Sequence, residues 1–206
     1  SGFYDIGILK YDSLGSQLLY ATYVGGSNSE SPHSLVMNAS GELLMLGTTS
    51  SGNFPTIEGA YSRTFQGGTP TSNVVPYASG SDIVISRFTS DGRLLLASTF
   101  VGGSLNDGLN ISNSPLTRNY GDQLRGDIIA DETGNVYVSS VTASEDLFSG
   151  TPGFQTVFQG GISDGILFKM DVALSKIIWG AYVGGSSADA SHTLKLDSEL
   201  NIFAAG

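Results

Sequence analysis

The stretch ATYVGGS at residues 21–27 decides the fold, because it occurs three times in the chain. It returns as STFVGGS at 98–104 and as GAYVGGS at 180–186. The first glycines of the three copies lie at 25, 102 and 184, so the copies are 77 and then 82 residues apart. Each copy is typical of a strand end, with small residues, an aromatic and a valine before a glycine pair. The chain is therefore an array of structural repeats.

Each repeat contains four apolar runs of strand length, and we call these positions a, b, c and d. They are rich in β-branched and aromatic residues and are bounded by Gly, Asn, Asp and Ser, as half-buried strands are. In the order a to d, the runs are 6–11, 18–24, 35–37 and 43–46; then 83–88, 94–101, 127–130 and 136–141; then 166–170, 177–183, 194–196 and 202–205. No segment shows a sustained period of 3.6 residues, so little helix is expected.

The connections from a to b and from c to d are short and predict hairpins. In the first two repeats they carry glycine at 15, 41, 92 and 134. Asp or Asn followed by Gly suits a type I turn with a bulge, in which the glycine has positive φ. The third repeat has Leu174 and Leu200 at the equivalent positions, a departure that is common in the terminal unit of an array.

Four short antiparallel strands in each of three repeats predict an all-β fold of β-propeller blades. The predicted blades span about 5–49, 82–143 and 164–206 of a single segment, 1–206, with long loops at 50–81, 102–124 and 144–163. Propellers need four to eight blades. The three blades are therefore expected to form an incomplete propeller or part of a larger one, completed by blades from the same or another chain.

Several strings resemble the SBBP-type β-propeller repeat: TYVGGS at 22–27, DETGNVYV at 131–138, TPGFQ at 151–155 and DGILFK at 164–169. The resemblance covers nearly the whole chain. It departs from the family in its long insertions, in Ser139-Ser140 where a Thr-Gly pair is expected, and in the leucines of the last repeat. It implies a secreted or surface-exposed bacterial protein of a kind common in Bacteroidetes-type bacteria, often beside adhesion-like modules. The family has no established catalytic residues, so the resemblance implies no enzyme and no cofactor.

The composition excludes several classes of partner and of metal site. The net charge of −10 and a pI near 4.3 argue against a nucleic-acid surface, which needs clustered Lys and Arg. There is no Cys, hence no thiolate metal site, and no apolar run of membrane-spanning length. No signal peptide is visible in 1–206.

All long connections join b to c or d to a, which places them at one end of an up-and-down blade. Loops on a rigid scaffold are where binding residues gather, so this face is expected to bind a protein or a glycan. The loop aromatics Phe54, Tyr61 and Phe65 recur as Phe148, Phe154 and Phe158. They are expected to staple the loops to the blade edge, whereas the unmatched Tyr77 and Tyr120 are candidates for an aromatic ligand platform.

An acid lies five residues after the first glycine of each pair, as Glu30, Asp107 and Asp189. These carboxylates are either caps of the b–c loops or binding groups, including oxygen ligands for a cation such as calcium. No calcium-loop motif accompanies them. His33 and His192 share a repeat position, matched by Gly126, and a structural histidine is expected there rather than zinc.

Two further patterns leave alternatives open. Each strand a pairs an acid with a cation five residues later, Asp5 with Lys10, Asp82 with Arg87 and Asp164 with Lys169. A spacing of five puts the two side chains on opposite faces, which favours bridges to neighbouring strands over a charged channel lining.

A polysaccharide-acting enzyme would need a carboxylate pair, for which Asp107, Asp122 and Asp127 are the candidates. A purely structural spacer is the third alternative.

Overall fold

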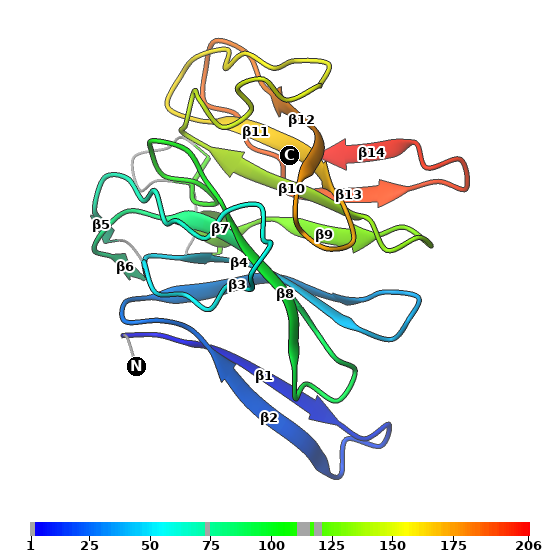
Figure 1. Cartoon of the computed structure of the whole chain (residues 1–206). Coiled ribbons are helices and arrows are strands. Elements are labelled where there is room, and N and C mark those ends of the chain that lie inside the picture. Colours follow the sequence, from blue (N-terminus) through cyan, green and yellow to red (C-terminus); the bar gives the residue numbers. More distant parts are fainter. Residues whose placement is uncertain (1–2, 73–74, 111–115, 118–120) are drawn as a thin grey trace.

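The computed structural model describes residues 3–72, 75–110, 116–117 and 121–206, and within them the protein is all-β (Figure 1). One short 3₁₀ turn, η1 (Asp122–Leu124), is the sole helical element described. The strands are β1 (Ile6–Tyr11), β2 (Leu18–Val24), β3 (Glu30–Met37), β4 (Leu43–Thr49), β5 (Thr71–Ser72), β6 (Pro76–Tyr77), β7 (Asp82–Phe88), β8 (Leu95–Val101), β9 (Asp127–Ala130), β10 (Val136–Thr142), β11 (Asp164–Met170), β12 (Ile177–Val183), β13 (Thr193–Leu196) and β14 (Ile202–Ala205).

Two four-stranded antiparallel sheets form the centre of the molecule, in the orders β3-β4-β7-β8 and β9-β10-β11-β12. Two-stranded sheets, β1-β2 and β13-β14, flank them, and β5-β6 is a small hairpin in a loop. Each four-stranded sheet thus joins positions c and d of one repeat to positions a and b of the next. The predicted blade boundaries at 5–49, 82–143 and 164–206 differ from these sheets by half a blade.

The difference arises because each d–a connection reverses the chain, so that strand a pairs with the strand d that precedes it. The d–a connection returns the chain antiparallel to β4, so that Thr49 lies opposite Asp82, and β10 meets β11 in the same way with Thr142 opposite Asp164. The b–c connection instead carries the chain to the next sheet. A d–a connection therefore lies within a sheet, and a b–c connection crosses between sheets.

The position-c strands β3, β9 and β13 lie next to one another where the sheets converge. Asp127 of β9 joins all three, because it accepts hydrogen bonds from Ser34 Oγ and Thr193 Oγ1, both at 3.0 Å. The sheets are stacked along the molecule from β1-β2 at one end to β13-β14 at the other (Figure 1). Within the described residues they form an open stack and not a closed ring.

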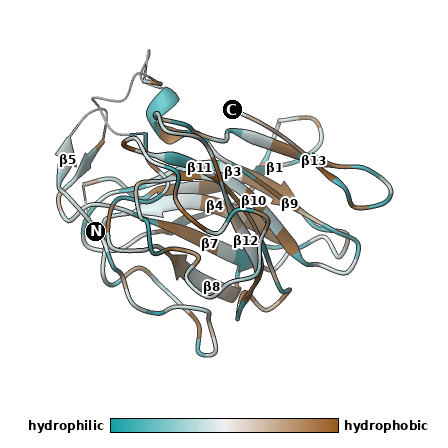
Figure 2. Cartoon of the chain, turned by 90° about the horizontal axis from the view of Figure 1, so that it is seen from above, coloured by the Kyte–Doolittle hydropathy of each residue, from teal (hydrophilic) through white to brown (hydrophobic). Residues whose placement is uncertain are grey.

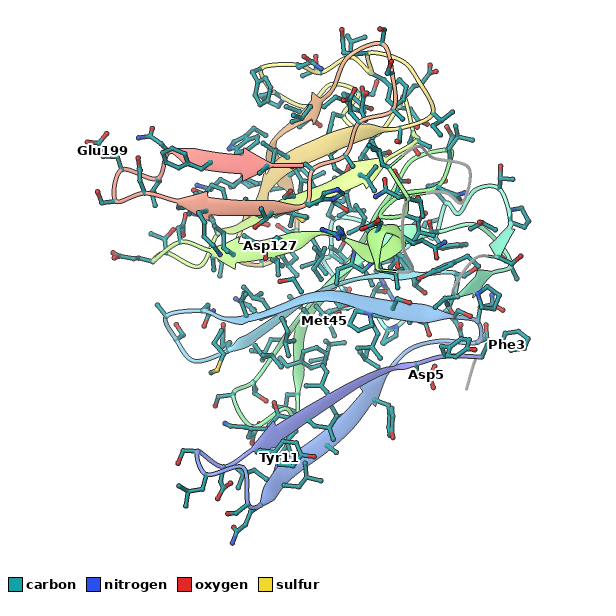
Figure 3. All side chains as sticks on the ribbon, turned by 180° about the vertical axis from the view of Figure 1, so that it is seen from behind. Phe3, Asp5, Tyr11, Met45, Asp127 and Glu199 are labelled. Carbon is teal, nitrogen blue, oxygen red and sulfur yellow. The ribbon has the colours of Figure 1, made fainter. Side chains whose placement is uncertain are left out.

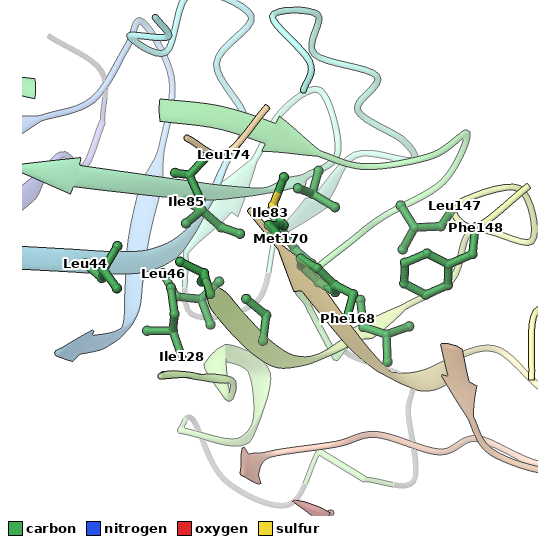
Figure 4. Packing of buried hydrophobic residues seen from close by; sticks show 14 of the residues in the cluster. Leu44, Leu46, Ile83, Ile85, Ile128, Leu147, Phe148, Phe168, Met170 and Leu174 are labelled. Atoms are coloured by element: carbon green, nitrogen blue, oxygen red, sulfur yellow. The ribbon is translucent and has the colours of Figure 1, made fainter. Parts of the chain in front are cut away.

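Two apolar layers hold neighbouring sheets together. The larger lies between the four-stranded sheets and includes Leu46, Ile85, Phe168 and Leu174, all fully buried (Figure 4). The smaller lies between β1-β2 and the next sheet. Hydrophobic residues accordingly concentrate on the packed strands, and the connections are mostly neutral or hydrophilic (Figure 2).

The hairpin turns follow the prediction from glycine placement. Gly15, Gly41, Gly92 and Gly134 all have positive φ, between 67° and 84°. Leu174 and Leu200 adopt the same left-handed conformation, at φ 55° and 63°. This conformation costs a leucine about 1–2 kcal/mol relative to glycine. Leu174 offsets that cost because its side chain is fully buried in the layer between the sheets, whereas Leu200 is 46% exposed.

Glycine at these two positions is expected to have opposite effects. Leu200→Gly should stabilise the protein by about 1 kcal/mol, since it removes strain and loses little packing. Leu174→Gly should destabilise it by roughly 2–4 kcal/mol, because the lost burial exceeds the strain relieved. Urea unfolding of both variants measures the difference. Equal effects of the same sign would contradict this assignment of the two leucines.

The long d–a connections also cover the outer edges of two strands. Residues 55–62 run along the outer edge of β8, with Ile57 N donating to Ser98 O at 3.2 Å and Phe100 N donating to Ser62 O at 3.1 Å. Residues 152–155 cover β12 in the same way, where Gly180 N donates to Pro152 O at 2.8 Å. Part of the loop length that was assigned to a binding face therefore protects the edge strands from pairing with other chains.

The loop aromatics act as the predicted staples. Phe54 and Phe65 lie 6.2 and 6.0 Å from Phe100 of β8, measured between ring centroids. Phe148 and Phe158 lie 5.2 and 5.7 Å from Tyr182 of β12. Tyr61 and Phe154, the third matched pair, are 40% and 73% exposed and do not share this packing.

Candidate functional site

The repeated acids cap the b–c loops. Glu30, Asp107 and Asp189 accept hydrogen bonds from the backbone N–H of the second glycine of each pair, at 3.1, 2.8 and 2.7 Å. In the first two repeats the carboxylate also binds the end of strand d. Thr49 Oγ1 donates to Glu30 at 2.6 Å, and Thr142 and Ser144 hydroxyls bind Asp107. These contacts tie one sheet's crossing loop to the neighbouring sheet.

The burial of these acids decides their role. Glu30 is 2% and Asp107 0% exposed, while Asp189 is half-buried. A buried carboxylate that already accepts several hydrogen bonds has no surface for a glycan or a protein ligand. Of the two alternatives left open for Glu30 and Asp107, the geometry supports capping and not ligand binding.

A second acid approaches the same glycine pair. It is the first residue of strand a in the second and third repeats, and the residue before strand a in the first. Asp82 accepts from Gln66 N and Gly67 N at 2.7 and 2.8 Å, and Asp164 accepts from Gln159 N at 2.8 Å. A Cβ on Gly102 would lie 2.5 Å from the carboxyl carbon of Asp82, and Asp5 approaches Gly25 in the same way. The first glycine of each pair is therefore required by a neighbouring carboxyl group, which is buried at Asp82 and Asp164 and exposed at Asp5.

The pKa values of four of these carboxyl groups, those of Glu30, Asp82, Asp107 and Asp164, are raised above the ordinary values. Burial raises the pKa of Asp107 to about 8, despite hydrogen bonds from Thr142 and Gly103 that lower it. Burial likewise raises the pKa of Asp82 to about 6, and it raises the pKa of Glu30 and Asp164. The strand-a acid adds a repulsion that acts in the same direction on Glu30 and Asp107.

The two tyrosine candidates do not form a platform in the described structure. Tyr77 of β6 is fully buried, and its hydroxyl hydrogen-bonds Thr48 Oγ1 at 2.8 Å. Burial raises its pKa to about 12. Tyr77 is thus a core residue that anchors the β4–β7 connection. Tyr120 lies outside the described residues.

The described residues contain no cluster of three or more His, Cys, Asp and Glu side chains placed to hold a metal ion. His33 Nε2 hydrogen-bonds Thr48 Oγ1 at 3.2 Å, and burial lowers the His33 pKa to about 4. A Cβ on Gly126 would lie 3.2 Å from His33 Nδ1, so glycine at this repeat position makes room for the histidine of the preceding sheet. The packing of His33 agrees with a structural role.

The three acids named for glycan cleavage are engaged in structural contacts. Asp107 caps its loop, and Asp122 pairs with Arg125 at 2.6 Å. Asp127 accepts from Ser34, from Thr193 and from Leu194 N, the last at 3.3 Å. A retaining or inverting mechanism needs two free carboxyl groups that face one sugar ring. Nothing in these contacts favours such a mechanism.

The cations of strand a bridge to neighbouring strands. Arg87 lies 3.5 Å from Glu42, and Lys169 lies 3.3 Å from Asp131. In both cases the acid belongs to the c–d turn of the preceding repeat, and the acid five residues before the cation is not the partner. Lys10 is equivalent to Arg87 and Lys169, and Asp197 is equivalent to Asp131. No ion pair involves Lys10 or Asp197 in the described residues.

A groove of about 420 Å³ opens on the loop face between the two four-stranded sheets. Three connections line it. The β4–β7 connection contributes 69–71, the β8–β9 connection 105–106, and the β10–β11 connection Ala143, Glu145, Phe158, Gly161 and Ile162. Its large apolar side chains are Leu105, Phe158 and Ile162, of which Leu105 and Ile162 are 43% and 41% exposed. Glu145 provides a charge at the groove. This size lies within the range of small-ligand pockets.

None of the four predicted binding residues that the structure describes, Glu30, Tyr77, Asp107 and Asp189, lines this groove. Leu105, Ile162 and Glu145 were not singled out from the sequence, and Phe158 was assigned only a stapling role. The available signal was the length of the connections, which marks the correct face but not the side chains. Asn106 also lines the groove, but its amide already donates to Thr69 O and accepts from Ser81 N.

A scan against protein-family models and a search of curated proteins gave no match to the chain. The described part of the chain holds no helix with the length and hydrophobicity needed to cross a membrane.

Proposed function

We propose that this chain is a non-catalytic β-propeller module of a secreted or cell-surface bacterial protein, and that the groove on its loop face binds a protein partner. The groove between the two complete sheets is the observation that carries this function. The convergence of β3, β9 and β13 at Asp127 and the resemblance to the SBBP-type repeat support the propeller arrangement. An acidic protein with short hairpins at one end and long connections at the other suits a surface assembly.

The lining of the groove favours a protein segment over a glycan. Glycan sites depend on several polar groups free to bind hydroxyls. In this groove the amide of Asn106 is already used within the protein, and Glu145 is the one charged side chain of the described lining. Leu105 and Ile162 instead offer exposed apolar surface beside Phe158, and Phe154 and Val157 in the same connection are 73% and 67% exposed. Exposed apolar side chains gathered beside a groove are typical of peptide-binding surfaces.

Selection of binders from a random peptide library, in parallel with a glycan array, tests this function. Peptides selected on the protein should bind at least tenfold more weakly to Ile162→Asp and Leu105→Asp, since each variant places a charge in the groove. Leu14→Asp is the matched control, because Leu14 is 86% exposed in the opposite hairpin turn. Glycan binding that the groove variants abolish would replace the protein partner with a glycan. No binding at the groove would leave the chain a spacer.

A further inference from the structure

The loops that border the groove are built on hydrogen bonds that the first repeat also makes. In each repeat, two successive backbone N–H groups of the b–c loop donate to two side chains of the d–a connection. These bonds are Ser104 N to Asp146 Oδ1 and Leu105 N to Ser144 Oγ, both at 2.9 Å, and in the first repeat Ser27 N to Asn53 Oδ1 at 2.9 Å and Asn28 N to Ser51 Oγ at 2.8 Å. The matched bonds align the two repeats residue by residue.

The two repeats differ at two positions that line the groove. Leu105 corresponds to Asn28, and Glu145, which lies between the two acceptors of the second repeat, corresponds to Gly52. The first repeat forms the same loop bonds with a short polar residue at one position and no side chain at the other. The side chains of Leu105 and Glu145 are therefore not needed for the loop structure, and they give this groove an apolar and an acidic group that the first repeat lacks.

The carboxylate of Glu145 has no counter-charge within the described residues. It is exposed, and it takes part in no hydrogen bond or ion pair there. The adjacent acid, Asp146, is by contrast occupied, because the N–H and the hydroxyl of Ser104 both donate to its Oδ1, at 2.9 and 3.2 Å. The described lining of the groove contains no lysine or arginine.

The charge of the groove thus selects between ligands. A positively charged group would meet a free carboxylate beside exposed apolar surface, in a protein whose net charge is −10. An acidic ligand would be repelled by the same groups. The volume of about 420 Å³ has room for a few side chains, so a charge and an apolar group that enter together belong to one short segment.

We infer that the segment bound in the groove carries a Lys or Arg that pairs with Glu145, beside an apolar side chain that packs against Leu105 and Ile162. This specificity rests on the peptide binding proposed above and adds the feature that selects the peptide.

Selection from a random-peptide library on the parent protein and on Glu145→Lys tests the charge. Peptides selected on the parent should be enriched in Lys and Arg relative to the unselected library, and those selected on Glu145→Lys should be enriched in Asp and Glu. Glu199→Lys is the matched control and should select as the parent does. This exposed acid lies in the β13–β14 turn, at the opposite end of the strands from the β5–β6 hairpin beside the groove (Figure 3). The same preference on the parent and on Glu145→Lys would overturn the charge pairing.

A double-mutant cycle locates the partner of Glu145. Glu145→Gln, and glutamine in place of the basic residue of a selected peptide, should each weaken binding roughly three- to fivefold. The two changes together should weaken it no further than either alone, because both remove the same pair. Added salt should weaken binding to the parent more than to Glu145→Gln. Independent losses from the two changes, or equal salt dependence of the two proteins, would contradict the pairing.

Two variants taken from the first repeat separate this specificity from peptide binding itself. Leu105→Asn and Glu145→Gly install the residues that the first repeat carries on the same hydrogen bonds, so folding should be retained. Peptides that Leu105→Asn and Ile162→Asp bind weakly but Glu145→Gly binds as the parent does would keep the groove as the binding site and overturn the charge pairing. Failure to select any peptide would overturn both.

Discussion

The free energy of unfolding is expected to fall by at least about 2 kcal/mol when the pH is raised from 5 to 8.5. Most proteins with acidic surfaces lose stability toward acid, because native carboxylates there must be protonated. In this protein the buried acids act in the opposite sense. Asp107 and Asp82, with pKa values raised by burial to about 8 and about 6, dominate the effect.

The sign follows from proton binding. Between the ordinary aspartate pKa near 4 and the raised native values, the folded protein holds protons that the unfolded chain has released. The stability that these protons provide is complete below about pH 4 and is lost as the pH rises through the native pKa values. Asp131 acts in the opposite direction, since hydrogen bonds from Thr133 and Asn135 and the nearby Lys169 outweigh its burial and lower its pKa. Its contribution is lost only in strong acid, so it does not oppose the fall above pH 5.

Asp107→Asn isolates the largest contributor. Asparagine is neutral like the protonated acid. Its oxygen can accept from Gly103 N, and its amide can donate to Thr142 Oγ1 once that hydroxyl, which donates to Asp107 in the parent protein, rotates to accept. The variant should match the parent protein near pH 5 and exceed it in stability at pH 8.5. Urea unfolding at the two pH values measures both proteins. A parent protein whose stability is constant or rises over this interval would contradict the burial of a protonated Asp107.

Gly102→Ala is expected to destabilise the protein by about 3 kcal/mol. The added Cβ would lie 2.5 Å from the carboxyl carbon of Asp82 and 2.6 Å from its Oδ1. Asp82 cannot withdraw, because it is fully buried and holds Gln66 N and Gly67 N. Either the carboxyl group or the β8 end must move, and each movement breaks hydrogen bonds in the β4–β7 connection.

Gly7→Ala provides the matched control for this variant. Gly7 lies in β1, and an added Cβ would meet nothing closer than 3.6 Å, at Tyr23 Cε1. Alanine there should be neutral or stabilising by a few tenths of a kcal/mol, since it restricts the unfolded chain. Both substitutions are read from urea unfolding midpoints. A Gly102→Ala variant as stable as Gly7→Ala would show that the glycine pair is not required by the buried carboxyl.

Local features of the fold could be predicted from the sequence because they depend on neighbouring residues. The strands, the hairpin turns with glycine at positive φ, and the cap geometry of Asp107 four residues after Gly103 are of this kind. The grouping of strands into sheets could not be, since a repeat keeps the same period whichever strand begins the sheet. The pairing of Thr49 with Asp82 across a connection of more than thirty residues sets that grouping.

The candidate site was less predictable than the fold. Leu105, Phe158 and Ile162 come from two connections that meet only after the sheets have packed. Glu30 and Asp107 are binding candidates by sequence because charged loop residues are usually accessible, but both carboxyl groups are buried and accept a hydrogen bond from the second glycine of the pair. A glycine pair followed by an acid in each repeat indicates this packing, once the role of the glycine is known.

The sheet grouping on which the groove depends is measured most directly by NMR. Cross-strand nuclear Overhauser effects should connect β4 to β7, with Leu46 opposite Ile85 and Gly47 opposite Val84, and should connect β10 to β11 in the matching register. No such contacts should join β2 to β3. Contacts between β2 and β3, with β4 and β7 unconnected, would show sheets confined to single repeats and would contradict this arrangement.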